Sequence, residues 1–399
     1  MKLQQLPLNN KRVLLRVDYN VALENGRVAE PKRIEATLPT LRYLLERKAT
    51  VIVLSHLGRP KGQDVQFSLK PVTETLASYL KKEKLPHSGC SLWPGTYPSA
   101  ETKKRVDSME EGEILLLENL RFNAGEEKND AALAKGLAEL GDCFVQEAFG
   151  ALHRAHASVD ALPRQLPSAF GFLVEKEIEV LTKVLTNPPK PFVVLLGGVK
   201  VSDKIGAIEN FLKRGVDKVL VGGALAYTFL SSQGIGVGQS PVEKDWVGRV
   251  GELMKRQNGS RRLILRQDHW IVQDFKNPTN PKVTDGPGIP EGWEGMDVGP
   301  KTLEVFGREI AQAKTIFWNG PVGVIEVAPF EKGSSQIAAL VAAQTKKRTL
   351  TVLGGGDTIH AISKAKISET AFSHVSTGGG ATIEFLEGKT LPGIAAIQQ

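Results

Sequence analysis

Short apolar runs recur along this chain, and stretches with helical periodicity separate them. Strands that are buried on both faces carry nearly continuous apolar residues, so this alternation is typical of a parallel sheet covered by helices. The runs lie at residues 11–17, 49–55, 113–119 and 143–149 in the first half and at 191–197, 217–222, 261–267, 315–320, 349–354 and 374–377 in the second. We therefore expect the α/β class, with two domains that each contain a doubly wound, mainly parallel sheet.

A boundary between the two domains is visible in the middle of the chain. The 399 residues exceed the ~250 to 300 at which a single hydrophobic core stops growing. Residues 172–185 have helical periodicity, and the sequence NPPKP follows at 187–191, through which no helix can continue. We therefore expect a first domain over residues 1–171 and a second over 172–384, which begins with the bridging helix 172–185.

The composition is that of a folded protein. Hydrophobic residues make up 41% and charged residues 24%, which excludes a disordered chain. No apolar run approaches the ~20 residues that span a bilayer, and the opening MKLQQLPLNN has no apolar signal core, so we expect a cytoplasmic protein. Cys90 and Cys143 are too few for a disulfide framework, and we expect reduced, inert thiols.

The net charge of +7 is spread over the whole chain. Residues 1–172 hold 24 basic and 21 acidic side chains, and the remainder holds 27 and 23. Without a basic tail or stripe, this balance favours anionic partners only weakly, and we expect no nucleic-acid partner.

Arginine and histidine follow the apolar runs of the first half. The carboxyl ends of parallel strands meet at one edge of a sheet, which is where ligands bind in open α/β folds. The residues delivered there are Arg16, Arg59, Arg121, Arg154, His56, His153 and His156, with Arg33 expected from the next helix start. A single arginine is more often part of a surface ion pair, but guanidinium groups at four strand ends predict a site for a compact polyanion. Asp18 and Asn20 are expected to contact its hydroxyl groups.

Glycine follows the runs of the second half instead. The clusters are Gly197-Gly198, Gly222-Gly223, Asn319-Gly320-Pro321, Gly354-Gly355-Gly356 and Gly378-Gly379-Gly380. Glycine lets backbone amides approach a phosphate closely, and each following helix offers its positive end to the same anion. One glycine pair alone is usually a turn, but five clusters at strand ends predict a nucleotide site.

Charged residues beside these glycines indicate how a nucleotide and its metal ion would be bound. The segment 202–215 has helical periodicity, with Ser202 as the expected N-cap and Gly215 as the stop. Lys200 and Lys204 would share a face of this helix if it begins early enough. Asp357 follows glycines at a helix start and suits either N-capping or a Mg²⁺ ion that bridges phosphates, and Glu326 suits a ribose hydroxyl or a metal-bound water.

Several common nucleotide motifs are missing from the sequence. There is no G-x-x-x-x-G-K-[ST] loop, and the H-R-D and D-F-G sequences of protein kinases are absent. Phosphoryl transfer depends mainly on positioning and charge neutralisation, and a carboxylate acceptor is already ionised at neutral pH. A reaction of that kind needs no general base, which agrees with the lack of an evident one.

Several segments, in this order along the chain, closely resemble the phosphoglycerate kinase family. They are RVDYN, SHLGRPKG, LLENLRFNAGEEKND, AFGALHRAHAS, GGVKVSDKI, AYTFL, GWEGMDVGPKT, FWNGPVGVIE, GGGDT and HVSTGGGATIEFLEGKTLPG, between residues 16 and 393. The resemblance implies reversible phosphoryl transfer from 1,3-bisphosphoglycerate to MgADP, giving 3-phosphoglycerate and MgATP, in glycolysis and gluconeogenesis. It also implies a monomer of two Rossmann-like domains that close about a hinge, with residues 385–399 returning to the first domain.

The resemblance assigns roles to residues of this chain. It places the 3-phosphoglycerate contacts at Asp18, Asn20, Arg33, His56, Arg59, Arg121 and Arg154. It places the nucleotide contacts at Gly197, Gly198, Lys204, Asn319, Glu326, Gly356, Asp357 and Thr358. Lys200 and Arg33 are expected to stabilise the group in transfer, and Asp357 is expected to be the carboxylate linked to Mg²⁺.

Several positions depart from the family's usual pattern. Gln146-Glu147 stands where Asn-Asp is common, Ala224 where a third glycine is usual, and Lys32 where a small polar residue is usual. The sequence RQDHW at 266–270 replaces a more apolar strand end. These departures bear on the shape of the nucleotide pocket and on the rate of domain closure. The sequence as a whole leaves the choice between ATP and GTP open. A weakened nucleotide sensor is the alternative to an active enzyme, but Lys200, Lys204, Asp357 and Arg33 favour activity.

Overall fold

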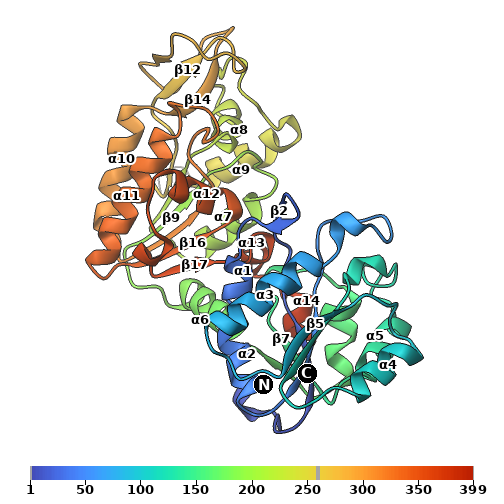
Figure 1. Ribbon diagram of the computed structural model, residues 1–399. Helices are drawn as coiled ribbons and strands as arrows, with labels where there is room; N and C mark the ends of the chain where they lie inside the picture. Colours follow the sequence, from blue (N-terminus) through green and yellow to red (C-terminus); the bar gives the residue numbers. More distant parts are fainter. Residues whose placement is uncertain (1, 258–260, 399) are drawn as a thin grey trace. The chain divides into compact units, whose positions relative to one another are not determined.

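The computed structural model describes residues 2–257 and 261–398, and the chain in it forms two compact units. The first unit comprises Met1–Glu179 and Thr390–Gln399, and the second comprises Val180–Lys389. The division falls inside helix α6 (Phe172–Thr186), which is coloured light green in Figure 1. The C-terminal segment therefore belongs to the same unit as the N-terminus.

The first unit is built on a six-stranded sheet in the order β5-β6-β4-β1-β7-β8, and every strand pair in it is parallel. The strands are β1 (Arg12–Arg16), β4 (Thr50–Leu54), β5 (Gly89–Trp93), β6 (Glu113–Leu117), β7 (Cys143–Gln146) and β8 (Ser168–Phe170). The four runs expected from the sequence are the inner strands β6, β4, β1 and β7. The outer strands β5 and β8 were not expected.

The helices of the first unit lie between these strands in the chain, except for α14 near the C-terminus. They are α1 (Lys32–Glu35), α2 (Leu38–Leu45), α3 (Lys70–Lys82), α4 (Ala100–Asp107), α5 (Ala131–Ala138) and α14 (Pro392–Ala395), and a short hairpin pairs β2 (Leu23–Glu24) with β3 (Arg27–Val28). The helical stretch between β1 and β4 is divided into α1 and α2. The division precedes Pro39, which lies in the first turn of α2. Proline is tolerated there because the backbone nitrogens of a helix's first turn have no hydrogen-bond partner within the helix.

The second unit is built on another parallel sheet, in the order β11-β10-β9-β15-β16-β17. Its strands are β9 (Phe192–Leu196), β10 (Lys218–Val221), β11 (Leu263–Ile264), β15 (Thr315–Asn319), β16 (Leu350–Gly354) and β17 (His374–Ser376). A separate antiparallel sheet contains β12 (His269–Val272), β13 (Lys282–Val283) and β14 (Glu294–Val298). The run expected over 261–267 contributes only two residues to β11. Two sheets of parallel strands with helices confirm the expected α/β class.

The helices of the second unit correct one expectation from the sequence. They are α7 (Ile205–Lys213), α8 (Leu225–Ser232), α9 (Val247–Gln257), α10 (Pro300–Gln312), α11 (Lys332–Lys346), α12 (Gly356–Lys364) and α13 (Gly380–Leu386). Ser202 is not the N-cap of α7, because its hydroxyl is bonded to Glu243 at 2.7 Å and Lys204 occupies the cap position. Lys200 and Lys204 therefore do not share a helical face. Gly215 follows the end of α7 with φ +74°, as expected for a helix stop.

Apolar strands form the centre of each unit. Every residue of β4 and of β9 is buried. Cys143 is also buried, and burial raises the pKa of both cysteine thiols to about 12, so they are protonated at neutral pH. None of the helices in the described residues combines the length and apolarity that crossing a membrane requires.

Candidate functional site

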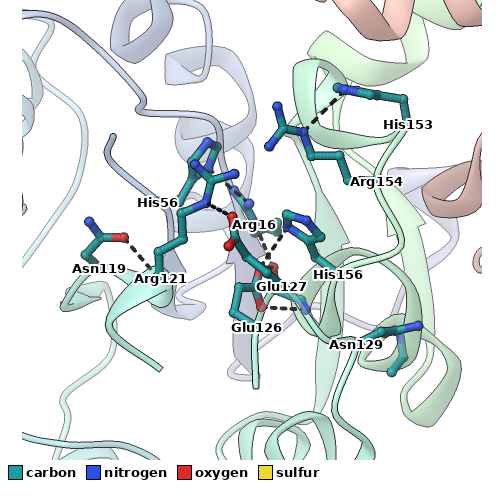
Figure 2. A network of polar contacts seen from close by, with 12 residues as sticks. Arg16, His56, Asn119, Arg121, Glu126, Glu127, Asn129, His153, Arg154 and His156 are labelled. Atoms are coloured by element: carbon teal, nitrogen blue, oxygen red, sulfur yellow. Dashed lines mark hydrogen bonds and ion pairs between the residues drawn. The ribbon is translucent and has the colours of Figure 1, made fainter. Parts of the chain in front are cut away.

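Arg16 is the centre of a polar network at the carboxyl edge of the first sheet (Figure 2). It is the last residue of β1 and is 1% exposed. Its Nε donates to the Ser158 hydroxyl at 2.8 Å, and its Nη2 lies 3.2 Å from Nδ1 of His56. Burial lowers the pKa of Arg16, and the nearby Glu126 opposes this effect. A buried cation is thereby placed where two strands end.

Glu126 holds this network together from the loop that precedes α5. It is fully buried, and its two carboxylate oxygens accept hydrogen bonds from the Ser158 amide at 3.0 Å and the Ser158 hydroxyl at 2.6 Å. The His156 ring lies 3.9 Å from the same carboxylate. Ser158 thus links the Glu126 carboxylate to the Arg16 guanidinium, so the buried charges compensate each other.

His56 and His156 carry no charge at neutral pH. Burial, together with the adjacent Arg16 charge, lowers the pKa of His56 to about 3. Burial lowers the pKa of His156 to about 4, with Arg121 and Arg154 acting in the same direction. Both rings are therefore neutral hydrogen-bonding groups, and the positive charge of the edge comes from arginine.

Arg121 reaches the same edge from the end of β6. Its backbone amide donates to the Asn119 side chain at 3.0 Å, and its Nε lies 3.0 Å from a Glu127 carboxylate oxygen. Its Nη1 also donates to the carbonyl of Gly58. Burial lowers the pKa of Arg121, and the charges of Arg154, Arg16 and Arg59 act in the same direction. The positive charges of three arginines thus act on Arg121, and this concentration of positive charge favours an anionic ligand at this edge of the sheet.

The remaining residues expected at this edge differ in how firmly the protein holds them. Arg33 is paired with Asp18. Burial would raise the pKa of Asp18, but the charges of Arg33 and Arg16 outweigh this effect and lower it. The Asn20 side chain accepts from the Gly58 amide at 2.8 Å. Arg154 Nε donates to His153 at 3.3 Å, and Arg59 is exposed. We call the set Arg16, Arg33, Arg59, Arg121 and Arg154 the arginine edge.

A pocket of about 620 Å³ lies at the carboxyl edge of the second sheet, and we call it the glycine pocket. It is lined by Gly198, Val199, Lys200, Ser202, Asp203, Lys204, Asn319, Gly320, Gly355, Gly356, Asp357, Thr358, Gly379, Gly380, Ile383, Glu384, Glu387 and Lys389. Lys200 and Lys204 therefore meet in one pocket even though they do not share a helix. Gly197 is outside the lining, directly before Gly198.

The glycines of this edge serve two different purposes. A Cβ atom on Gly197 would lie 2.0 Å from the Pro321 carbonyl oxygen, and one on Gly223 would lie 2.4 Å from the Gly198 amide. These glycines allow neighbouring loops to pack backbone against backbone. Gly198 and Gly356 have open space around the Cβ position, so only such glycines leave room for a ligand.

Lys204 is fixed in the glycine pocket by Asn319. Its Nζ donates to the Asn319 side-chain oxygen, and Asn319 Nδ2 donates to the Gly354 carbonyl at 2.7 Å. Burial lowers the pKa of Lys204 to about 8, although Asp203 and Asp357 oppose this effect. The Thr358 hydroxyl accepts from the Gly320 amide at 2.7 Å and donates to the Gly354 carbonyl at 2.7 Å. Thr358 and Asn319 thus position the pocket's loops with their side chains.

Asp357 lies in the first turn of α12, where Gly355 is the N-cap. The capping role considered for Asp357 is therefore wrong. In residues 2–257 and 261–398, no group of three or more histidine, cysteine or acidic side chains is arranged to hold a metal ion. Asp357 and Asp203 both line the glycine pocket, which fits Mg²⁺ held by one or two carboxylates, water and substrate phosphates.

A second pocket of about 290 Å³ shares Gly198, Val199 and Asp357 with the glycine pocket, and we call it the side pocket. Its other lining residues are Gly223, Ala224, Tyr227, Pro241, Arg266, Phe275, Glu294, Gly295, Met296, Pro321, Gly323, Val324 and Glu326. Glu326 therefore lies in the side pocket. Aromatic and aliphatic side chains predominate in this lining, which suits a flat ring system.

Sequence reasoning did not identify Glu126, Glu127 and Ser158 as partners of the arginines. Glu126 and Glu127 belong to a motif that carried the family resemblance, but a carboxylate in a loop gives no sign of which cation it meets. One general rule could have pointed to them: a buried guanidinium requires a nearby negative charge, so acidic residues should be sought as partners of any buried arginine. Glu243, which holds Ser202, was likewise not expected.

Comparisons with known proteins agree on one family. The family model described as phosphoglycerate kinase matches residues 3–389. The phosphoglycerate kinase of Thermosipho africanus is 46% identical over 401 residues, covering 100% of this chain and 97% of the relative. A phosphoglycerate kinase of Thermus thermophilus is 45% identical over 397 residues, covering 99% of each.

Solved structures give the same result for the fold. The structure of phosphoglycerate kinase from Coxiella burnetii has a TM-score of 0.86 and 37% identity, covering 100% of this chain and 99% of its own. That from Pyrococcus horikoshii has a TM-score of 0.84 and 31% identity, covering 100% and 98%. The likeness therefore extends over both units.

Proposed function

We propose that this chain, which belongs to the phosphoglycerate kinase family, binds 3-phosphoglycerate at the arginine edge and MgATP at the glycine and side pockets. The chain is a phosphotransferase with a carboxyl group as acceptor, and it acts in glycolysis by reversible transfer between 1,3-bisphosphoglycerate and ADP. The observation that carries the residue assignment is the division of charge: arginines gather at the carboxyl edge of the first sheet, and glycines with two lysines gather at the carboxyl edge of the second.

At the arginine edge, positive charge would bind and orient the substrate. We assign Arg33, Arg59, Arg121 and Arg154 to its phosphate and carboxylate oxygens, since guanidinium forks bind such oxygens bidentately. Asp18 and Asn20 would direct its hydroxyl, and neutral His56, whose Nδ1 faces the Arg16 donor, would donate one hydrogen bond from Nε2. Arg16 is excluded from direct contact because its nitrogens are engaged with Ser158, Val17 and His56, so it acts as a support.

In the glycine pocket, lysines and backbone amides would bind the nucleotide's phosphates. The proposal places Lys204 on a nucleotide phosphate, and Gly197, Gly198 and Gly356 near the phosphate chain. Bound Mg²⁺ would supply charge neutralisation to the phosphate oxygens, with Asp357 as its protein carboxylate. Glu326 would accept from a ribose hydroxyl in the side pocket.

During transfer the phosphoryl group breaks its bond to one oxygen while it forms a bond to another, and its charge spreads over its three equatorial oxygens. We assign Lys200 and Arg33 to that charge, because only interactions that strengthen in the transition state raise kcat. The carboxylate acceptor is already ionised, so no residue has to remove a proton. The proposal includes a cytoplasmic monomer whose units close about a hinge. X-ray scattering with and without both substrates tests the closure, which should reduce the radius of gyration.

A coupled assay tests the function itself. Oxidation of NADH is followed while 3-phosphoglycerate and MgATP are supplied together and separately. We expect turnover only when both substrates and Mg²⁺ are present. Tight nucleotide binding without turnover would instead favour the nucleotide sensor considered from the sequence, and binding to nucleic acid at low salt would favour the alternative that the net charge raised.

A further inference from the structure

Arg266 is a buried arginine with unused hydrogen-bonding capacity. It follows β11 and is 1% exposed. Its Nη1 donates to the Tyr227 hydroxyl at 2.8 Å and to the Gly223 carbonyl at 3.2 Å, and its guanidinium carbon lies 5.0 Å from the centre of the Tyr227 ring. Within the described part of the chain, its Nε and Nη2 have no hydrogen-bond partner. Such a group is costly to bury, so acceptors from a ligand would stabilise it.

The charge of Arg266 is also only loosely compensated by the protein. None of the ion pairs found between described residues includes it. Asp297 is an acidic group whose pKa responds to the charge of Arg266. Burial raises the pKa of Asp297 to about 7, while its hydrogen bond with the Gly333 amide and the charge of Arg266 oppose that rise. The carboxylate of Asp297 accepts from the Gly333 amide at 2.7 Å and from the Val298 amide at 2.8 Å. Asp297 is thus committed to backbone amides and leaves Arg266 available.

Arg266 lines the side pocket and does not line the glycine pocket. The side pocket shares Asp357 and Gly198 with its neighbour and is otherwise lined largely by apolar and aromatic groups such as Phe275. Under the proposed function, the phosphates occupy the glycine pocket with its two lysines. The part of the nucleotide that reaches Arg266 is then the base.

We propose that Arg266 reads the base of the nucleotide and favours 6-oxopurines, guanine and hypoxanthine, over adenine. A guanidinium has donors and no acceptor. Guanine and hypoxanthine present two adjacent acceptors, O6 and N7, which an arginine binds bidentately, whereas adenine presents an amino donor beside N7. Glu294, which lines the same pocket, supplies an acceptor for the N1 hydrogen that 6-oxopurines carry and adenine lacks.

This inference rests on the proposed function and is tested by its dependence on the base. The measurement is kcat/KM for ATP, GTP and ITP at saturating 3-phosphoglycerate and Mg²⁺, for the unmodified protein and for Arg266→Met. We expect GTP and ITP to be used at least as efficiently as ATP. Arg266→Met should lower the efficiency of GTP and ITP relative to ATP by roughly ten-fold or more.

The control is Arg249→Met, which removes an arginine that is 49% exposed on α9 and lines neither pocket. It should leave the ratio between the nucleotides unchanged. An equal loss with all three nucleotides in Arg266→Met would make Arg266 a structural residue and overturn the inference. A preference of the unmodified protein for ATP over both GTP and ITP would do the same.

Two further results keep the outcomes separate. Thermal melting shows whether Arg266→Met folds. If it does not, the test becomes equilibrium binding of GDP, IDP and ADP to the unmodified protein, and tighter binding of ADP overturns the inference. If no nucleotide supports turnover in the unmodified protein, the proposed function fails, which is a different result from turnover without discrimination between bases.

Discussion

Lys204 donates a hydrogen bond to the side-chain oxygen of Asn319, and the amide nitrogen of Asn319 is itself bonded to the Gly354 carbonyl at 2.7 Å. The end of β15 therefore holds the ammonium group that precedes α7. This relay explains how a lysine without a helical neighbour keeps a fixed position in the glycine pocket. Positioning of this kind lowers the cost of ordering the side chain when an anion binds.

Replacement of Asn319 should weaken nucleotide binding. In Asn319→Ala, Lys204 loses its acceptor and the Gly354 carbonyl loses a donor in a buried environment, which costs about 1 to 3 kcal/mol. We expect KM for the nucleotide to rise by about ten-fold and KM for 3-phosphoglycerate to change little. Initial-rate kinetics with each substrate varied in turn check this. An unchanged KM for the nucleotide would show that Asn319 does not support the lysine.

The charge of Lys204 should also appear in the pH dependence of nucleotide use. Burial lowers the pKa of Lys204 to about 8, so the ammonium is charged below that pH and neutral above it. Since kcat/KM reports on the free enzyme, its value for the nucleotide should fall as pH rises through about 8. The same profile for 3-phosphoglycerate is the internal control. Parallel profiles for the two substrates would contradict this role of Lys204.

Lys200 is expected to act mainly on the transition state. Lys200→Ala should lower kcat by about 100-fold or more and raise either KM much less, because its interaction strengthens as charge spreads over the transferred group. Lys213→Ala, at an exposed position near the end of α7, is the control for loss of a positive charge. Equal losses in affinity and turnover would make Lys200 a ground-state binding residue instead.

The link between Glu126 and Arg16 should matter for both stability and substrate binding. Ser158→Ala removes the hydroxyl that bridges them, leaving buried charges with fewer partners, and should reduce the free energy of unfolding by about 1 to 3 kcal/mol. KM for 3-phosphoglycerate should rise while KM for the nucleotide stays constant. Urea unfolding and initial-rate kinetics measure these two effects. Unchanged stability would mean that the bridge contributes nothing.

Glu147 gives the first unit a stability that depends on pH. It is fully buried, its carboxylate interacts with the Thr40 hydroxyl, and the Leu173 amide at the start of α6 donates to it at 3.2 Å. Burial raises its pKa to about 8, against the effect of these hydrogen bonds. The folded state therefore holds a proton that the unfolded state releases near pH 4.5, and stability declines as pH rises from there through about 8.

The substitution Glu147→Gln removes this titration and keeps the shape of the side chain. At pH 9 the variant should be more stable than the unmodified protein by about 2 to 4 kcal/mol, and near pH 5 the two should be alike. Urea unfolding at both pH values measures the difference in stability. Asp297, whose pKa is also raised by burial, titrates in both proteins, so its contribution cancels in this difference. A difference that does not change with pH would contradict the titration of Glu147.

The sequence was most informative where burial is complete. The inner strands β1, β4, β6 and β7 were predictable because both of their faces are covered, which requires apolar runs. The outer strand β5 is only partly buried, and β8 has three residues, so neither produces such a run. The start of α7 was not predictable, because the Ser202 hydroxyl that would cap it is bonded to Glu243, which is 41 residues away.

The candidate site was predictable to a similar degree. Arginines and glycines at strand ends could be read from the order of residues, since parallel strands bring their carboxyl ends to one edge. The partners of these residues could not, because Glu126, Ser158 and Asn319 meet them only through tertiary packing. The two purposes of the glycines were also hidden, since sequence does not distinguish a glycine beside another backbone from one beside open space.

The division of ligands between the two units is tested most directly by one kinetic comparison. Both KM values are measured for Arg154→Ala, at the arginine edge, and for Asp357→Ala, in the glycine pocket. We predict that Arg154→Ala raises KM for 3-phosphoglycerate alone and that Asp357→Ala raises KM for MgATP alone. If either substitution instead raises the KM of the other unit's substrate, the assignment of 3-phosphoglycerate to the arginine edge and of the nucleotide to the glycine pocket is wrong.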